Sequence, residues 1–479
     1  MSTILTALAL QTMLLISPLG PDQLKASLDP VLLDKSEHVD VVTISGKFSY
    51  AEYREPGLAT AARAGFPTHS VVAPAAVAFG SCRREKGRIF AKRGAACGFV
   101  LPLSGDNGSI NLLSFDELTV SGDFTGSWRI AFADDALAAV QDNVPFGTLT
   151  GSGSRRFPLA GLSRRADLSR ARQLVLLLDS ASGSAHVREL AFRHVPHEPA
   201  GNGSAIWIWR RDRVLGHEET VLKRLAARGV RRAYLQVGDD PEVFAPFLAQ
   251  AARAGVEVYA LDGSPGYVDA PGELLGRIGR IEAYNESHPG ARFAGFQVDI
   301  EPYLNKDYAS RKLHYAKAYA ELLGRLKKSF RLPLSVVIPS WFDTVPAGGR
   351  SLLQRVFESA HEVVVMSYRT DPGRALEISA AALSLGERYC VPVRLGIEMG
   401  NIPDEQHQEL DRCAPGVPGA LQLGSSWWCR GAAYPVPGSR ISFKNKLEEL
   451  PSFMRTAIPF ASFRGWVLHS YEELPPEHE

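Results

Sequence analysis

The sequence predicts a multidomain protein in which an N-terminal β-sandwich precedes a C-terminal α/β domain, a TIM or (β/α)₈ barrel. Two observations carry this prediction. Across residues 41–196, short apolar or alternating runs such as "VDVVTI" and "RQLVLLLDS" are separated by turn residues, as in a β-sandwich. Across residues 205–479, apolar strands alternate with amphipathic helices, as in a barrel. The segment "HEPAGNGS", residues 197–204, has the composition of a linker.

The barrel prediction rests on eight strand candidates with helical stretches such as "LHYAKAYAELLGRLKKSF" between them. An open doubly wound sheet is the alternative. It would need a Gly-rich phosphate-binding turn after the first strand, where "WIWRRDR" stands. The expected strands span residues 205–209, 233–237, 256–261, 296–301, 334–340, 363–368, 391–398 and 465–471.

Charge and hydropathy argue against two classes of partner. Lys and Arg number 53 and Asp and Glu number 52, so no net charge attracts nucleic acid. No apolar run after the N-terminus is as long as a membrane-spanning helix. We therefore expect neither a nucleic-acid partner nor a transmembrane segment.

Residues 1–20 are a possible signal segment. Their apolar stretch, residues 4–16, suits the apolar region of a signal peptide and is too short to span a bilayer. No positive charge precedes it and no small-x-small cleavage site follows, so a packed N-terminal helix is the alternative. This stretch favours a periplasmic or secreted location over a cytoplasmic one.

The five cysteines have none of the spacings of a zinc site. If the protein is exported, Cys82 with Cys97 and Cys413 with Cys429 could each close a loop. Free buried thiols are the alternative.

The strand "GFQVDIEPY", residues 295–303, carries an unusual polar face. Gln297, Asp299 and Glu301 alternate along it and therefore share one side. Pro302 biases Glu301 toward extended geometry at the strand's end. Catalytic groups of a barrel lie at the C-terminal ends of its strands, so we expect Asp299 and Glu301 at the mouth. A buried network with Arg partners is the alternative.

Other strand ends carry polar and aromatic residues as well. Collected at one rim, they would form a pocket suited to a sugar, since aromatic faces stack on C–H surfaces and carboxylates bond hydroxyl groups. With Gln297 they are the expected substrate-binding set, Glu398 being a catalytic candidate. They are Trp209, Gln236, Asp262, Tyr303, Trp341, Tyr368, Arg369, Glu398, His469 and Tyr471.

A long Pro- and Gly-rich stretch, residues 401–442, follows the seventh expected strand. A loop of such length is usually functional or disordered. Trp427 and Trp428 make it a candidate wall over the substrate cleft.

Residues 205–471 resemble (β/α)₈-barrel glycoside hydrolases. The D-x-E of Asp299 and Glu301, with the M-x-Y of Met366 and Tyr368, is similar to chitinase-type hydrolases. This resemblance implies that Glu301 is the acid, that Asp299 positions a substrate acetamido group, and that Tyr368 binds substrate. Two departures stand out: Phe296 and Gln297 interrupt the family's longer acidic run, and the eighth strand ends in His469 rather than Trp.

A second resemblance is to the hydrolase clan with catalytic Glu residues on the fourth and seventh strands. Glu301-Pro302 and "IEMG" around Glu398 match it, although Ile300 stands where the clan has Asn. This resemblance implies that Glu398 is the nucleophile. Carboxyl groups about 5–5.5 Å apart would favour retention, and about 6.5–9.5 Å would favour inversion. A substrate-assisted reaction would leave Glu398 as a hydroxyl-binding group.

The N-terminal domain resembles carbohydrate-binding modules in order and size, with Trp128 as an available aromatic. A purely structural domain is the alternative.

These features predict a glycoside hydrolase that cleaves a bacterial polysaccharide or oligosaccharide and needs no cofactor or metal. One alternative is a non-catalytic carbohydrate-binding or polysaccharide-assembly protein on a degenerate barrel. A metal-dependent barrel hydrolase is disfavoured, because the strand ends offer His469 but no H-x-H pair or clustered ligands.

The signal-segment hypothesis predicts the N-terminus of the native protein. N-terminal sequencing of protein purified from its source should find a chain that begins after Ser17. An intact Met1 or Ser2 in fractionated cells would contradict export.

Overall fold

The computed structural model describes residues 38–44, 48–54, 68–72, 76–85, 88–91, 97–103, 110–134, 143–199 and 203–475. The possible signal segment, residues 1–20, lies outside the described residues. Within these ranges, no helix is long and apolar enough to cross a membrane. The chain divides into two compact units, residues 1–54 with 403–438, and residues 55–402 with 439–479.

The larger unit contains a closed barrel of eight parallel strands, which confirms the barrel prediction. Pairing of Ala205 with Val467 and of Ile206 with Leu468 closes it. All eight expected strands are present, although the fourth ends before Asp299. In barrel order they are β12 (Ser204–Ile208), β13 (Val230–Gln236), β14 (Glu257–Asp262), β15 (Gly295–Val298), β16 (Leu334–Pro339), β17 (Glu362–Met366), β18 (Val393–Glu398) and β22 (Phe463–His469).

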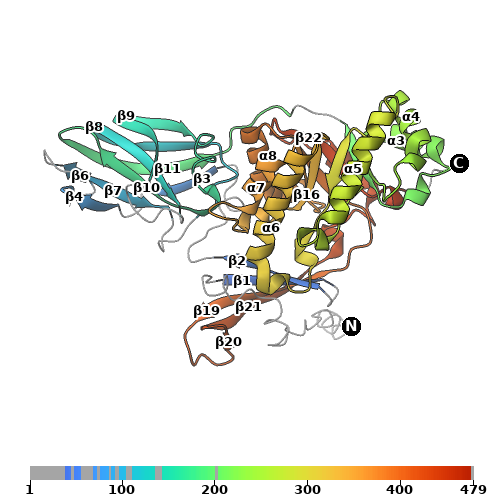
Figure 1. The fold of residues 1–479 in the computed structure, drawn as a ribbon. Coiled ribbons are helices and arrows are strands. Elements are labelled where there is room, and N and C mark those ends of the chain that lie inside the picture. Colours follow the sequence, from blue (N-terminus) through green and yellow to red (C-terminus); the bar gives the residue numbers. More distant parts are fainter. Residues whose placement is uncertain are drawn as a thin grey trace, which may run out of the picture. The chain divides into compact units, whose positions relative to one another are not determined.

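Helices connect these strands, and Figure 1 shows α5 to α8 along the outside of the barrel. Their starts follow local signals. Ser351 and Gln354 form a reciprocal capping box at the start of α7, and Asp371 caps α8. The helices are α3 (Glu218–Ala227), α4 (Ala245–Arg253), α5 (Gly272–Ser287), α6 (Tyr308–Ser329), α7 (Leu352–Ser359), α8 (Pro372–Tyr389) and α9 (Leu450–Met454).

A paired polar layer lies inside the barrel, among apolar and aromatic residues such as Trp207 and Tyr259. Glu362 bonds Arg394 at 3.1 Å, contacts Arg232, and accepts from Tyr234 at 2.6 Å. Burial alone would raise the pKa of Glu362, but the two guanidinium groups hold it below its usual value. A buried carboxylate–arginine network is therefore present in the barrel. It forms around Glu362, and not around Asp299 and Glu301 as the alternative interpretation of the sequence had it.

An antiparallel β region precedes the barrel, and its strand order is β4-β7-β10-β8-β11-β6-β5, with β3 on β11 and β9 on β8. This confirms antiparallel β structure here, while the two-sheet sandwich stays a prediction. Trp128 is fully buried, so it presents no ring to a sugar. The strands are β3 (Thr68–Val72), β4 (Val77–Gly80), β5 (Arg83–Glu85), β6 (Arg88–Ala91), β7 (Cys97–Pro102), β8 (Glu117–Asp134), β9 (Val144–Pro158), β10 (Ala171–Leu178) and β11 (Gly183–Arg193).

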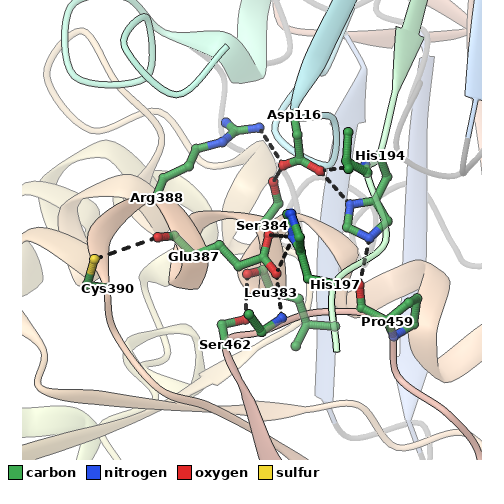
Figure 2. A network of polar contacts seen from close by, with 12 residues as sticks. Asp116, His194, His197, Leu383, Ser384, Glu387, Arg388, Cys390, Pro459 and Ser462 are labelled. Carbon is green, nitrogen blue, oxygen red and sulfur yellow. Dashed lines mark hydrogen bonds and ion pairs between the residues drawn. The ribbon is translucent and has the colours of Figure 1, made fainter. Parts of the chain in front are cut away.

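Asp116, just before β8, joins this β region to α8 and to the segment before β22 (Figure 2). Its Oδ2 meets His194 Nδ1 at 2.6 Å and its Oδ1 accepts from Ser384 at 2.8 Å. His194 also bonds the Pro459 carbonyl at 3.0 Å. Burial opposes ionisation, but the bond to His194 and the charge of Arg388 hold the pKa of Asp116 below its usual value.

The smaller unit is a five-stranded antiparallel sheet in the order β2-β1-β19-β21-β20. β1 and β2 were expected in the sandwich, but β1 pairs with β19. Residues 401–442 were expected to form a loop, and that expectation was wrong, because they supply three of the five strands. The strands are β1 (His38–Ile44), β2 (Phe48–Arg54), β19 (Glu405–Cys413), β20 (Leu421–Leu423) and β21 (Ser426–Val436).

Both expected cysteine pairs form disulfides. Cys82 bonds Cys97 in the β region, and Cys413 bonds Cys429 between β19 and β21. Cys390 is exposed and free. Disulfides persist in oxidising compartments, so these two are consistent with an extracellular or periplasmic location.

The Asp116 network predicts a pH-dependent stability effect. Asp116→Asn should lower the free energy of unfolding by about 3 kcal/mol, because it removes one partner of a buried charged network. Since the folded-state pKa of Asp116 is depressed, this loss should be full above about pH 4 and shrink as the pH falls through that pKa. Denaturant unfolding at several pH values measures it.

Asp179→Asn is the matched control, because Asp179 bonds Arg129 in an exposed pair. It should change the free energy of unfolding by less than about 1 kcal/mol. Equal losses in the two variants would contradict the role given to Asp116.

Candidate active site

Asp299 and Glu301 directly follow β15 and so lie at the C-terminal end of the barrel strands. The backbone at this point is tightly held. The Asp299 N–H donates to the Asp262 carbonyl at 3.0 Å. A Cβ on Gly263 would lie 1.9 Å from the Asp299 carbonyl oxygen, so only glycine allows this approach between the ends of β14 and β15.

The Asp299 side chain carries an unpaired buried acceptor. Its Oδ1 is shielded from solvent and has no hydrogen-bond partner among the residues that the structure describes. Burial raises the pKa of Asp299 well above its usual value, and the nearby charge of Glu301 raises it further. Such a group is suited to a ligand that brings its own hydrogen-bond donor.

Glu301 has the properties of a general acid. Burial raises its pKa, while a hydrogen bond from the Tyr303 hydroxyl and the proximity of His469 oppose that rise. Tyr303 stands edge-on to Trp341, with ring centroids 5.2 Å apart. A carboxyl group whose pKa is raised holds its proton to higher pH, and such a group can protonate a leaving oxygen.

Tyr368 links the carboxylates to His469. Burial raises the pKa of Tyr368 well above its usual value, and the charges of Glu398, Asp299 and Glu301 add to the rise. Its ring is stacked on His469 with centroids 5.8 Å apart. A Cβ on Gly396 would lie 3.1 Å from the Tyr368 ring, so glycine leaves room for it.

Glu398 is buried at the end of β18, with 3% of its surface exposed. Its Oε1 accepts from the Gly400 N–H at 2.5 Å, and its Oε2 meets His469 Nδ1 at 2.7 Å. Both carboxylate oxygens are therefore hydrogen-bonded within the protein. This arrangement fixes the Glu398 carboxylate and orients His469.

Three further predicted residues lie at this rim. Trp209 follows β12, with its ring centroid 6.1 Å from that of His469. Gln236 ends β13 on the face shared with Tyr234, which belongs to the interior core. Arg369 donates to its neighbour's carbonyl at Tyr368, at 2.6 Å.

Two predicted residues have partners within the fold. Gln297 is fully buried, accepts from Trp207 Nε1 at 2.7 Å and donates to Ser335 at 2.9 Å, so both ends of its amide group are hydrogen-bonded within the barrel. Asp262 has the opposite strand phase to Leu261, which faces the core, and it accepts from Arg277 of α5 at 2.7 Å. Substrate contact by either residue stays a prediction.

For three predicted aromatic residues, the described part of the chain shows no contact with the carboxylates of the site. Tyr471 is buried beneath the Arg224 guanidinium of α3, 4.7 Å from its ring centroid. Trp428 is fully buried and Trp427 half-buried, both on β21 of the smaller unit. Trp428 is therefore not the exposed loop aromatic that was expected, and a contact of Trp427 with substrate stays a prediction.

Glu472 was not predicted, although it joins the rim. It lies in the 3-10 helix η10 (Tyr471–Glu473), and its Oε1 accepts from the backbone N–H groups of Trp209 and Arg210 at 3.1 and 2.8 Å. The "YEE" that follows the last strand was the available sequence signal. That signal is weak, because the role of Glu472 depends on backbone groups 263 and 262 residues earlier in the chain.

Comparisons with known proteins give likenesses in structure alone. No protein-family model matches the chain, and no curated protein matches it. A chitinase from Chromobacterium violaceum is 14% identical, with 56% of this chain and 94% of that one covered and a TM-score of 0.31. The spore cortex-lytic enzyme of Bacillus cereus is 12% identical over 53% of this chain and 59% of its own, with a TM-score of 0.31.

A likeness to a family 29 carbohydrate-binding module, solved with mannohexaose, covers 26% of this chain and 91% of that one at 11% identity and a TM-score of 0.20. The barrel described above rests on the pairing of its own strands. No group of three or more His, Cys, Asp or Glu in the described part of the chain could hold a metal ion.

The unpaired carboxylate of Asp299 predicts a stabilising substitution. Because its folded-state pKa is raised, ionisation of Asp299 destabilises the fold as the pH rises above about 4 and toward that pKa. Asp299→Asn should therefore gain stability over the wild type across this range, reaching about 1–3 kcal/mol. Thermal and denaturant unfolding at a series of pH values from about 4 upward measures the gain.

The control is Asp239→Asn, since hydrogen bonds from Arg277 and Arg280 lower the pKa of the exposed Asp239 carboxyl. Its effect should have the opposite sign, a loss of stability as the pH rises. A loss of stability in Asp299→Asn at neutral pH would show that this carboxylate has a stabilising partner.

Proposed function

We propose that the protein is a glycoside hydrolase that cleaves an oligosaccharide or polysaccharide at the mouth of the barrel. One observation carries the proposal: Asp299 and Glu301, both with raised pKa values, stand together at the mouth beside Tyr303 and Tyr368. Paired carboxyl groups with separated tasks are what glycosidic bond cleavage needs. Aromatic neighbours offer faces on which a sugar ring can stack.

Glu301 is the proposed acid. In the first step its proton passes to the glycosidic oxygen as the bond from that oxygen to the anomeric carbon breaks. In the second step the Glu301 carboxylate takes a proton from water as the water oxygen bonds to the anomeric carbon. The residue thus returns to its starting protonation state, and one water is consumed for each bond cleaved.

The second group in the proposed reaction is the substrate itself. The unpaired acceptor beside Glu301 supports a substrate-assisted reaction, because it can hold an acetamido group, while the Glu398 carboxylate orients His469. In that scheme the acetamido oxygen of a 2-acetamido sugar bonds to the anomeric carbon and water later displaces it. Asp299 Oδ1, the unpaired acceptor, would receive the acetamido N–H. The chitinase-like D-x-E implies the same division of labour.

A location outside the cytoplasm fits this activity, because polysaccharides are met there. The disulfides Cys82–Cys97 and Cys413–Cys429 support that proposal. A metal or cofactor has no role in the scheme, since Glu301 and the substrate supply the proton transfer and the nucleophile.

The test compares variants on aryl glycosides with and without a 2-acetamido group. Glu301→Gln and Asp299→Asn should each lower kcat by about 10²–10⁴-fold, while Glu398→Gln should retain measurable turnover. The control Glu448→Gln changes an exposed residue and should leave kcat unchanged.

Azide added to each variant distinguishes the two mechanisms. Rescue of Glu398→Gln with an inverted glycosyl azide would show that Glu398 is the nucleophile and overturn the substrate-assisted scheme. Wild-type activity in Glu301→Gln would overturn the whole assignment. Binding of oligosaccharide by the wild type without any turnover would favour the non-catalytic carbohydrate-binding alternative.

A further inference from the structure

Two barrel strands that close the barrel bring Trp209 and His469 to the same edge of the mouth. Trp209 shares a strand face with Ala205 and Trp207, which belong to the interior core. His469 shares a face with Val467 of that core. Because β12 pairs with β22, the two rings meet edge to face, with an interplanar angle of 77°.

Glu472 holds the backbone at this edge of the mouth in place. Its Oε1 holds the backbone N–H groups of Trp209 and Arg210, so the carboxylate bridges the end of β12 and the turn after β22. Its other oxygen, Oε2, is buried and has no partner in the described chain. The indole Nε1 of Trp209 is buried and unpaired in the same way.

His469 contributes a third polar atom. Glu398, an acceptor, holds Nδ1, so Nδ1 carries a proton. Within the described residues Nε2 makes no hydrogen bond, and 30% of the side chain is exposed. The ring therefore presents Nε2 to the mouth as a polar atom without a protein partner.

An unpaired buried donor or acceptor disfavours the fold, and native proteins contain few of them. Here one buried donor and one buried acceptor lie around one edge of the mouth, with the unpaired Nε2 of His469 beside them. A hydroxyl group satisfies both kinds, since it accepts from Nε1 and donates to Oε2, and it can either donate to Nε2 or accept from it. An anion would be repelled by Glu472, and a metal cation could not accept from the indole N–H.

We propose that Trp209 Nε1, Glu472 Oε2 and His469 Nε2 form a second binding subsite for a neutral, hydroxyl-rich sugar unit. The subsite rests on the proposed function, because it holds a further unit of the same substrate beside the one attacked. Tyr368 lies between this subsite and the two carboxyl groups. Its ring stacks on His469, and the charges of Asp299 and Glu301 raise its pKa. The Trp209 ring offers its face to the C–H surface of that unit.

The test measures sugar binding and stability separately. Trp209→Phe removes the unpaired N–H and keeps an aromatic ring, and Glu472→Gln keeps an oxygen for the two backbone groups. Titration calorimetry in a Glu301→Gln background, with chitotetraose and cellotetraose as probes, should show Kd raised about 5–10-fold in each variant. The Tm of ligand-free Trp209→Phe should fall less than that of the control described next, because packing is lost but no hydrogen bond of the free protein is.

Trp466→Phe is the matched control, because its Nε1 donates to the Met454 carbonyl at 3.0 Å. It should lower Tm and leave Kd unchanged. An unchanged Kd in Trp209→Phe would overturn the subsite. Failure of both probes to bind the unsubstituted protein would overturn it as well.

A separate measurement of turnover distinguishes failure of the subsite from failure of the proposed function. Trp209-dependent binding by a protein that hydrolyses no glycoside would retain the subsite and overturn only the proposed hydrolase. If Glu301→Gln abolishes turnover but the Kd is unchanged in Trp209→Phe and Glu472→Gln, the proposed hydrolase would be retained and the subsite overturned.

Discussion

An unpaired carboxylate buried at the end of a four-residue strand is the constraint on which the site depends. β15 ends at Val298, and Asp299 then places Oδ1 where no residue of the described part of the chain donates to it. The backbone cannot relieve this, because Asp299 is bonded to the end of β14 and packed against Gly263. The pKa of Asp299 rises in consequence, and Glu301 stands beside it under the same burial.

The interior of the same barrel holds a second buried carboxylate, Glu362, which is paired with arginine side chains. Below the mouth, Glu362 is as deeply buried as Asp299 Oδ1, but Arg232 and Arg394 face it and its pKa is lowered. Gln297 joins that layer through Ser335, which bonds Glu362 at 3.0 Å. One layer of the barrel is thus satisfied internally and supports the fold. The next layer toward the mouth keeps unpaired groups, and we infer that a ligand completes it.

Much of this fold could be predicted from local pattern, and less of the site. The barrel strands were found because apolar runs alternate with helices, and Asp299 and Glu301 because two carboxylates end one strand. The partners of Gln297 could not be predicted, because Trp207 and Ser335 come from strands far along the chain. The bond from Arg277 to Asp262 could not be predicted either, because it depends on how α5 packs against β14.

The smaller sheet was missed for a related reason. Val41 of β1 pairs with Gln408 of β19, and no local signal reveals a pairing between such distant segments. The strand "EQHQELDRC" is also polar enough to resemble a loop. The role of Glu472 could not be predicted, because it depends on the backbone N–H groups of Trp209 and Arg210 at the other end of the barrel sequence.

The identity of the acid is the central claim, and Tyr303 gives direct access to it. The hydrogen bond from Tyr303 lowers the pKa of Glu301, so Tyr303→Phe should raise that pKa. The measurement is the pH dependence of kcat/KM on a neutral aryl glycoside, whose alkaline limb reports the acid of the free enzyme. We expect that limb to move to higher pH in Tyr303→Phe. A limb that keeps its position in a variant that remains active would show that the proton comes from a group other than Glu301.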